Sequence, residues 1–116
     1  MSYSTHIDLK ILFASIEDTA ILGPGGDSQP YRDFAYAWVN DKLRGNRTVP
    51  ISSPSENVVL TEANYAIFLV LRSYKHMDYY KFFSTAESLL DALLTVQLNG
   101  ALKGVAYIIS ADVQRK

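Results

Sequence analysis

Apolar residues recur at three- and four-residue spacing along most of the chain, a period that predicts helices rather than strands. Near the start, Thr5 and Asp8 have the spacing of a capping box, which marks the beginning of a helix. The apolar positions that follow at helical spacing are Leu9, Leu12, Phe13 and Ile16. We therefore expect a short helix with one apolar face at this end.

A second amphipathic helix is predicted over residues 30–44, because Pro30 suits a first helical turn and Gly45 suits a helix end. Its apolar stripe is expected to contain Tyr31, Phe34, Ala35, Trp38, Val39 and Leu43. The opposite, polar side is expected to contain Arg32, Asp33, Asn40, Asp41 and Arg44. We interpret Trp38 as a core residue, since large aromatic side chains mostly serve packing. The glycine-rich residues before this helix predict a loop.

A third helix is predicted from Ser53, which precedes Pro54 and lies three residues before Glu56, to about Tyr74. Its apolar residues cover more than one face, which is typical of a central helix. In a chain of this size, burying such a helix requires wrapping by the other elements or by a neighbouring subunit. A homo-oligomer is therefore one expectation.

The segment 74–83 has five aromatic residues and two lysines in ten positions. We interpret it as a helix–helix junction or a contact surface, with Tyr79 and Tyr80 as contact residues. Interleaved basic and aromatic side chains can also bind single-stranded nucleic acid. A fourth helix is predicted to begin at Ser84, which forms a capping-box pattern with Glu87, and to run to about residue 98, where Asn99 and Gly100 end it.

The last apolar segment, residues 105–109, is short, β-branched and aromatic, which predicts a strand or extended arm. It would pair with residues 48–51 or with a neighbouring subunit, because a lone strand leaves its edges unpaired. Its contact residues would be Tyr107, Ile108 and Ile109. The predicted fold is mainly α, a small bundle of about four helices. Residues 1–104 would form a single helical domain and residues 105–116 a C-terminal arm or short β-strand.

The amino-acid composition argues against several classes of functional site. The 116 residues fit one domain, and a net charge of −1 lacks the basic excess that strong nonspecific DNA binding needs. Without cysteine there are no disulfides or thiolate sites, and with only two histidines, His6 and His76, carboxylates would have to supply most ligands of a metal site. The apolar run 63–71 is far shorter than the roughly 20 residues of a membrane span. We expect no membrane insertion, no cofactor, no metal and no catalytic residues.

The order of these pieces carries a resemblance: a short helix at residues 5–10, a loop, residues 38–45 ending in Arg44 and Gly45, a Val-Pro-Ile linker at 49–51, and a long helix opened by Ser53 and Pro54. Over about residues 5–98 this order resembles the head-tail connector proteins of tailed viruses, also called adaptor or head-completion proteins. The resemblance implies a structural virion subunit that is assembled in the host cytoplasm and forms a ring below the portal.

If the resemblance holds, the partners are further copies of the chain, the portal and tail proteins, and DNA that passes through without sequence readout. The subunit contacts would include Arg44, Asn46 and Arg47 in an exposed turn, together with the C-terminal arm.

Two other functions stay open. A small helical module could bind a partner protein through residues 74–83. A nucleic-acid-binding regulator is less favoured; its cations would be Lys42, Arg44, Arg47, Lys75 and Lys81. An enzyme ranks last, because no pair of residues can be assigned catalytic roles from their spacing.

Overall fold

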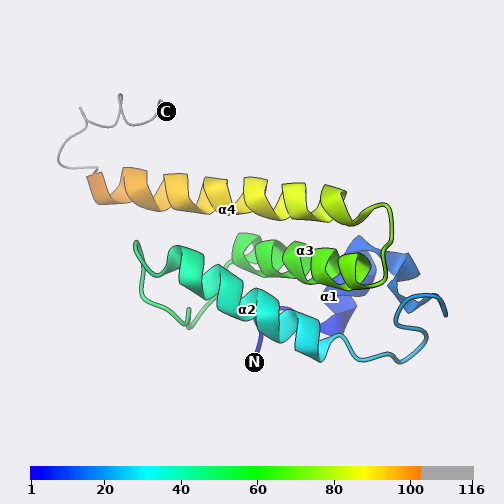
Figure 1. Ribbon diagram of the computed structural model, residues 1–116. Helices are drawn as coiled ribbons and strands as arrows, with labels where there is room; N and C mark the ends of the chain where they lie inside the picture. Colours follow the sequence, from blue (N-terminus) through cyan, green and yellow to red (C-terminus); the bar gives the residue numbers. More distant parts are fainter. Residues whose placement is uncertain (103–116) are drawn as a thin grey trace.

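The computed structural model describes residues 1–102, with side chains up to Thr95, as a small, mainly α bundle (Figure 1). This confirms the predicted fold class. Its elements in chain order are α1 (His6–Leu12), the 3₁₀ helix η1 (Ala14–Glu17), α2 (Gln29–Leu43), α3 (Glu56–Ser73) and α4 (Tyr79–Leu102). The predicted strand or arm at residues 105–109 lies outside the described residues.

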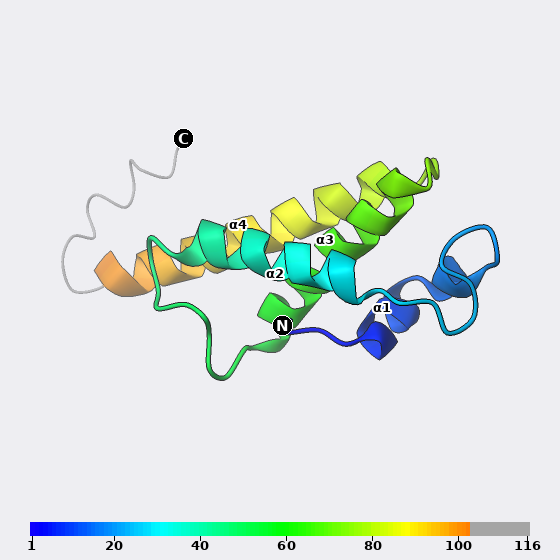
Figure 2. The same ribbon diagram turned by 60° about the horizontal axis from the view of Figure 1, so that its bottom comes forward.

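Helix α3 is the centre of the bundle. Helices α2 and α4 run antiparallel to it on two sides, and α1 packs against it as well (Figures 1 and 2). Its buried residues are Val58, Thr61, Glu62, Ala63, Asn64, Ala66, Ile67, Phe68, Val70 and Leu71. The chain's own helices therefore bury α3, and its apolar composition does not require a neighbouring subunit.

The core has two parts. The larger one joins α1, η1 and the start of α4 to the C-terminal half of α3, with Leu9, Ile16, Ile67 and Leu71 fully buried. The smaller one joins the last turns of α2 to the start of α3 and to α4; its buried members are Val39, Leu43, Val58, Leu90 and Leu93. Together they fix α3 from both ends.

The predicted start of the first helix is confirmed in detail. The Thr5 side chain accepts a hydrogen bond from the Asp8 amide, and the Asp8 carboxylate accepts one from the Thr5 amide. The predicted start of α3 was wrong by two residues: its N-cap is Ser55, not Ser53. The extended linker continues through Pro54, so it is the Ser55 hydroxyl that reaches the Val58 amide, at 3.3 Å.

Both predicted ends of the fourth helix were wrong. Helix α4 begins at Tyr79 rather than Ser84, because Phe82 and Phe83 pack on Phe13 and Phe68 and this packing favours a helical first turn. The connection to α3 is confined to residues 74–78. At the other end α4 continues through Gly100 to Leu102. A single glycine costs a helix only about 1 kcal/mol, which does not force a stop.

The buried face of α2 is rotated relative to the predicted stripe. Phe34, predicted to be in the core, is 71% exposed, whereas Asn40, predicted to be on the polar side, is buried. The reason is the segment before α1, which lies along α2 and whose Tyr3 hydroxyl donates a hydrogen bond to Asn40 Oδ1. The segment covers the polar side of α2 and leaves Phe34 on the uncovered side.

Candidate functional site

The predicted contact residues after α2 separate into two kinds. Arg44 is exposed and forms an ion pair with Asp41, with 3.1 Å between Nη1 and Oδ1. Arg47 is half-buried, and its Nη2 donates a 3.0 Å hydrogen bond to the Leu93 carbonyl of α4. Asn46 is half-buried too, and its Oδ1 has no hydrogen-bond partner among the described residues. Arg44 is thus available to a partner, while Arg47 fastens the linker to α4.

The predicted aromatic contact residues lie at the start of α4, beside the α3–α4 turn. The Tyr80 side chain is exposed. The Tyr79 ring is partly packed against Phe68, with 6.0 Å between the two ring centroids. Next to them Met77 is 86% exposed. The other predicted contact residues, Tyr107, Ile108 and Ile109, lie outside the described residues.

The five cations proposed for nucleic-acid binding do not form one patch. Lys42, Arg44 and Arg47 belong to the C-terminal end of α2 and the linker after it. Lys75 and Lys81 belong to the α3–α4 turn and the first turn of α4, at the other end of the bundle (Figure 1). This separation gives no support to a single binding surface.

An aromatic groove of about 480 Å³ lies between α2 and α3. Its lining residues are Tyr31, Phe34, Trp38, Tyr65, Leu69, Arg72 and Ser73. The Trp38 ring stacks on Tyr65 with 3.9 Å between ring centroids and 3° between planes. Trp38 is half-buried, so its predicted core role is only partly correct: its ring packs on Tyr65 and also lines the groove.

A second hollow of about 550 Å³ adjoins the groove and shares Trp38 and Tyr65 with it. Its other lining residues come from α2 and α4; they are Lys42, Phe83, Glu87, Leu90, Asp91 and Leu94. Burial raises the pKa of the Tyr65 hydroxyl, and the nearby Arg72 charge opposes that shift. The charged surroundings of the two shared rings therefore differ, with one arginine in the first hollow and one lysine and two carboxylates in the second.

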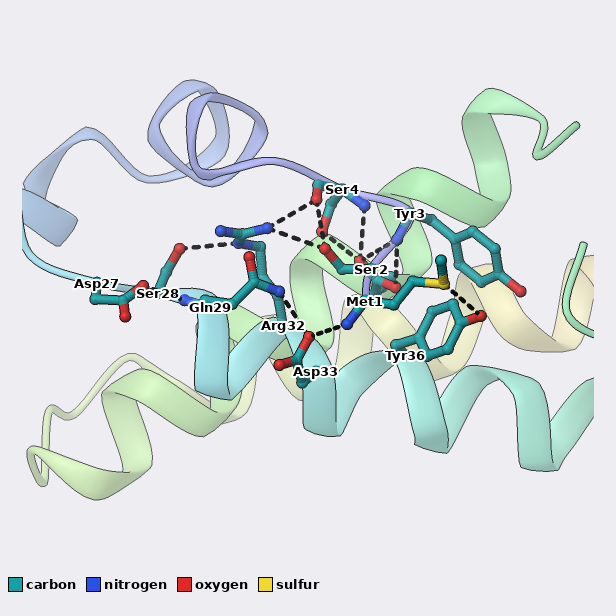
Figure 3. Close-up of polar contacts among 11 residues, drawn as sticks. Met1, Ser2, Tyr3, Ser4, Asp27, Ser28, Gln29, Arg32, Asp33 and Tyr36 are labelled. Carbon is teal, nitrogen blue, oxygen red and sulfur yellow. Dashed lines mark hydrogen bonds and ion pairs between the residues drawn. The ribbon is translucent and has the colours of Figure 1, made fainter. Parts of the chain in front are cut away.

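The N-terminal anchor, which we define as Glu62 with Tyr3, Ser4 and Arg32, was not recognised from the sequence. Glu62 is fully buried and accepts hydrogen bonds from the Tyr3 amide (2.9 and 3.0 Å), the Ser4 amide (2.8 Å) and the Ser4 hydroxyl. From α2, Arg32 Nη1 donates to the Ser4 carbonyl at 3.0 Å and to Ser2 Oγ at 2.9 Å (Figure 3). Burial raises the pKa of Glu62, while the hydrogen bonds from Ser4 and Tyr3 oppose the shift.

One sequence signal could have revealed this anchor. Glu62 is an acidic residue within the otherwise apolar and neutral residues 58–71 of a predicted central helix. A carboxylate is buried in such a place only when it is paired or hydrogen-bonded. Its partners, however, lie nearly sixty positions earlier in the chain, so the sequence alone could not identify them.

A second polar chain has the residue types of a hydrolase triad. His6 Nδ1 lies 2.8 Å from Ser28 Oγ, and His6 Nε2 lies 2.9 Å from Glu17 Oε2. Its hydrogen bond to His6 lowers the pKa of the Glu17 carboxyl. Ser28 is only 1% exposed, and its Oγ also accepts a hydrogen bond from Arg32 Nε at 2.9 Å. A substrate has no access to this hydroxyl. The hydrogen bonds among Glu17, His6 and Ser28 therefore hold η1, α1 and the start of α2 together.

Residues 1–102 contain no cluster of three or more histidine and acidic side chains that could hold a metal ion. Within the same residues, no helix has the length and apolar composition needed to cross a membrane. In comparisons with known proteins, no family model, curated protein or solved structure matches this chain.

Proposed function

We propose that this chain is a non-catalytic structural subunit of the head-tail connector of a tailed virus, and that it assembles with copies of itself below the portal. The order of a short helix, a loop, α2, an extended linker and the long α3 supports this proposal. The near-neutral net charge suits a conduit through which DNA passes without being held. The portal and tail proteins of the same virion would be its neighbours.

The observation that carries the proposal is a pair of separate apolar patches. Ile7 and Ile11 lie one turn apart on the outer face of α1, and Ile11 is 76% exposed. Met77 and Tyr80 form the second patch, at the α3–α4 turn. Figure 2 shows α1 and this turn at different edges of the bundle. A ring is built from head-to-tail contacts, and such contacts require two different patches on each subunit.

The test is a complementation experiment read by light scattering over a concentration series. Serine is placed at both positions of one patch (Ile7→Ser with Ile11→Ser) or of the other (Met77→Ser with Tyr80→Ser). The wild-type chain is expected to form a discrete oligomer, and each variant alone a monomer. An equimolar mixture of the two variants is expected to form dimers, because each variant keeps the patch that the other has lost.

Asn57→Ser, at an exposed position of α3 away from both patches, is the matched control and should keep the wild-type mass. A wild-type chain that stays monomeric at every concentration contradicts self-assembly. A chain that ends at Gly104 tests the predicted arm separately: if residues 105–116 join subunits, this version loses the oligomer while its helices persist.

A second candidate function is a helical module that binds a partner protein through residues 74–83. The exposed side chains of Met77 and Tyr80 support this function as much as they support the connector role. Substituting Tyr79 and Tyr80 by alanine would then abolish partner capture without changing helicity or mass in solution. A change in mass would instead favour the connector.

A further inference from the structure

The aromatic groove has a cation at one end and no acidic residue in its lining. Arg72 is exposed, and its guanidinium carbon lies 4.9 Å from the centroid of the Phe68 ring. Among the described residues no carboxylate forms an ion pair with it. Close by, Tyr31 Oη and Ser73 Oγ lie 3.3 Å apart, and the hydroxyl that accepts in this hydrogen bond can still donate one to a ligand. This end of the groove therefore suits an anion.

The body of the groove suits a large apolar side chain. Trp38, Tyr65 and Leu69 line it, and Phe34 extends from α2 beside it with 71% of its surface exposed. Its volume of about 480 Å³ lies within the range of small ligand sites, roughly 300–1,000 Å³. Tryptophan, tyrosine and arginine are also the residue types that contribute most to the affinity of protein interfaces.

We propose that the aromatic groove binds a segment of a partner protein in which a large apolar side chain is followed by a carboxylate. The apolar side chain lies against Trp38 and Tyr65, and the carboxylate accepts hydrogen bonds from Arg72. Stacking on Phe68 already restrains the guanidinium, so less conformational entropy is lost when the carboxylate binds. This site is a property of one chain and does not rest on the proposed connector role.

The neighbouring hollow indicates the orientation of the bound segment. Glu87 and Asp91 line that hollow on the α4 side of the shared Trp38 and Tyr65 rings, and Lys42 lines it on the α2 side, so its lining carries a net negative charge. A carboxylate is therefore disfavoured there relative to the groove, whose lining carries only the positive charge of Arg72. The acidic end of the segment therefore lies toward the C-terminus of α3.

The test uses two small probes, N-acetyl-L-phenylalanine and its neutral amide. Trp38 is the sole tryptophan of the chain, so its indole N–H gives one nuclear magnetic resonance signal that reports on the groove. We expect the carboxylate probe to shift this signal saturably and the amide to bind about tenfold more weakly, because a charge-assisted hydrogen bond is lost. This comparison needs no variant and so does not depend on how a substitution folds.

Variants then assign the effect to Arg72. Arg72→Gln is expected to weaken the carboxylate probe to the level of the amide. Arg44→Gln, the matched control at an exposed arginine outside the groove, should leave both affinities unchanged. Equal affinity for the two probes, no saturable shift, or an unchanged affinity in Arg72→Gln would overturn the proposal.

One further outcome identifies a different occupant. If the indole signal of the Met77→Ser, Tyr80→Ser variant, which lacks one assembly patch, still moves with protein concentration in the absence of any probe, a second copy of the chain fills the groove and the proposal is overturned. Probe binding is measured by the Trp38 indole signal, whereas self-assembly is measured by light scattering. The Met77→Ser, Tyr80→Ser variant therefore tests the groove separately from the connector role. It should lose assembly and still bind the carboxylate probe.

Discussion

The N-terminal anchor and the aromatic groove both place a charged residue of α3 beside side chains of α2, yet the two charges are treated in opposite ways. Glu62 is fully buried, and Tyr3 and Ser4 of the same chain supply its hydrogen bonds. Arg72 is exposed at the end of a groove whose aromatic side chains are open to water. One site is completed by the chain itself, and the other is open to a ligand.

The difference shows how to separate folding from binding in this molecule. Burying a carboxylate costs several kcal/mol unless hydrogen bonds replace the lost water, so the anchor must form whenever the chain folds. An exposed cation contributes little to folding. Arg72 can therefore serve a partner without a large loss of stability.

The largest expected effect comes from breaking the anchor. Glu62→Ala leaves the Tyr3 and Ser4 amides without their acceptor, so we expect the free energy of unfolding to fall by about 3 kcal/mol. Urea unfolding followed by circular dichroism measures it. Glu56→Ala, at an exposed position in the first turn of the same helix, is the control and should stay within about 0.5 kcal/mol of wild type.

The pH dependence of stability gives a sharper view of the same carboxylate. Burial raises the pKa of Glu62 above its ordinary 4.5, so the folded chain holds this proton at a higher pH than the unfolded chain does. The stability that this group contributes is full below 4.5 and is lost as the pH rises through the raised pKa. The difference in unfolding free energy between wild type and Glu62→Gln should therefore shrink as the pH rises across this window. A difference that grows with pH would show that the hydrogen bonds outweigh burial.

The arginines after α2 provide an intermediate case. Arg47→Ala removes the hydrogen bond to the Leu93 carbonyl, and we expect a loss of about 1 kcal/mol in thermal or urea unfolding. Arg44→Ala removes an exposed ion pair and should change stability by less than about 0.5 kcal/mol. Equal effects would mean that Arg47 does not fasten the linker to α4.

The smallest expected effect on stability comes from a substitution in the aromatic groove. Phe34→Ser replaces a side chain that is mostly exposed, so the free energy of unfolding should change by no more than about 0.5 kcal/mol. The same variant is expected to weaken binding of N-acetyl-L-phenylalanine to the groove. A loss of stability as large as that of Glu62→Ala would show that Phe34 belongs to the core and that the groove is not an open site.

Much of the helical architecture could be read from short-range patterns. The Thr5 and Asp8 capping box begins a helix in the structure as predicted, because both partners lie within one turn of each other. Errors appeared where a local signal competed with tertiary packing or with the path of the linker. The pattern around Pro54 indicated Ser53, but the linker continues to Ser55. At the fourth helix, Ser84 lies inside a helix that begins at Tyr79, because Phe82 and Phe83 pack on Phe13 and Phe68.

Among the predicted contact residues, local sequence indicated an exposed turn after α2 but not which side chain stays exposed. Arg44 and Arg47 have the same chemistry and differ in their position relative to α4. The aromatic groove was not predicted, because Trp38 and Tyr65 become neighbours only when α2 packs on α3. The connector resemblance stays a prediction.

Helix periodicity and most capping signals depend on residues within one or two turns of each other, so local patterns are enough to predict a small helical bundle. Which charges are enclosed and which face solvent depends on tertiary packing. The pairing of Glu62 with Tyr3 and Ser4, and the exposure of Phe34 and Arg72, depend on contacts between segments far apart in the chain. Burial is a property of packed surfaces, so it is settled when the helices meet.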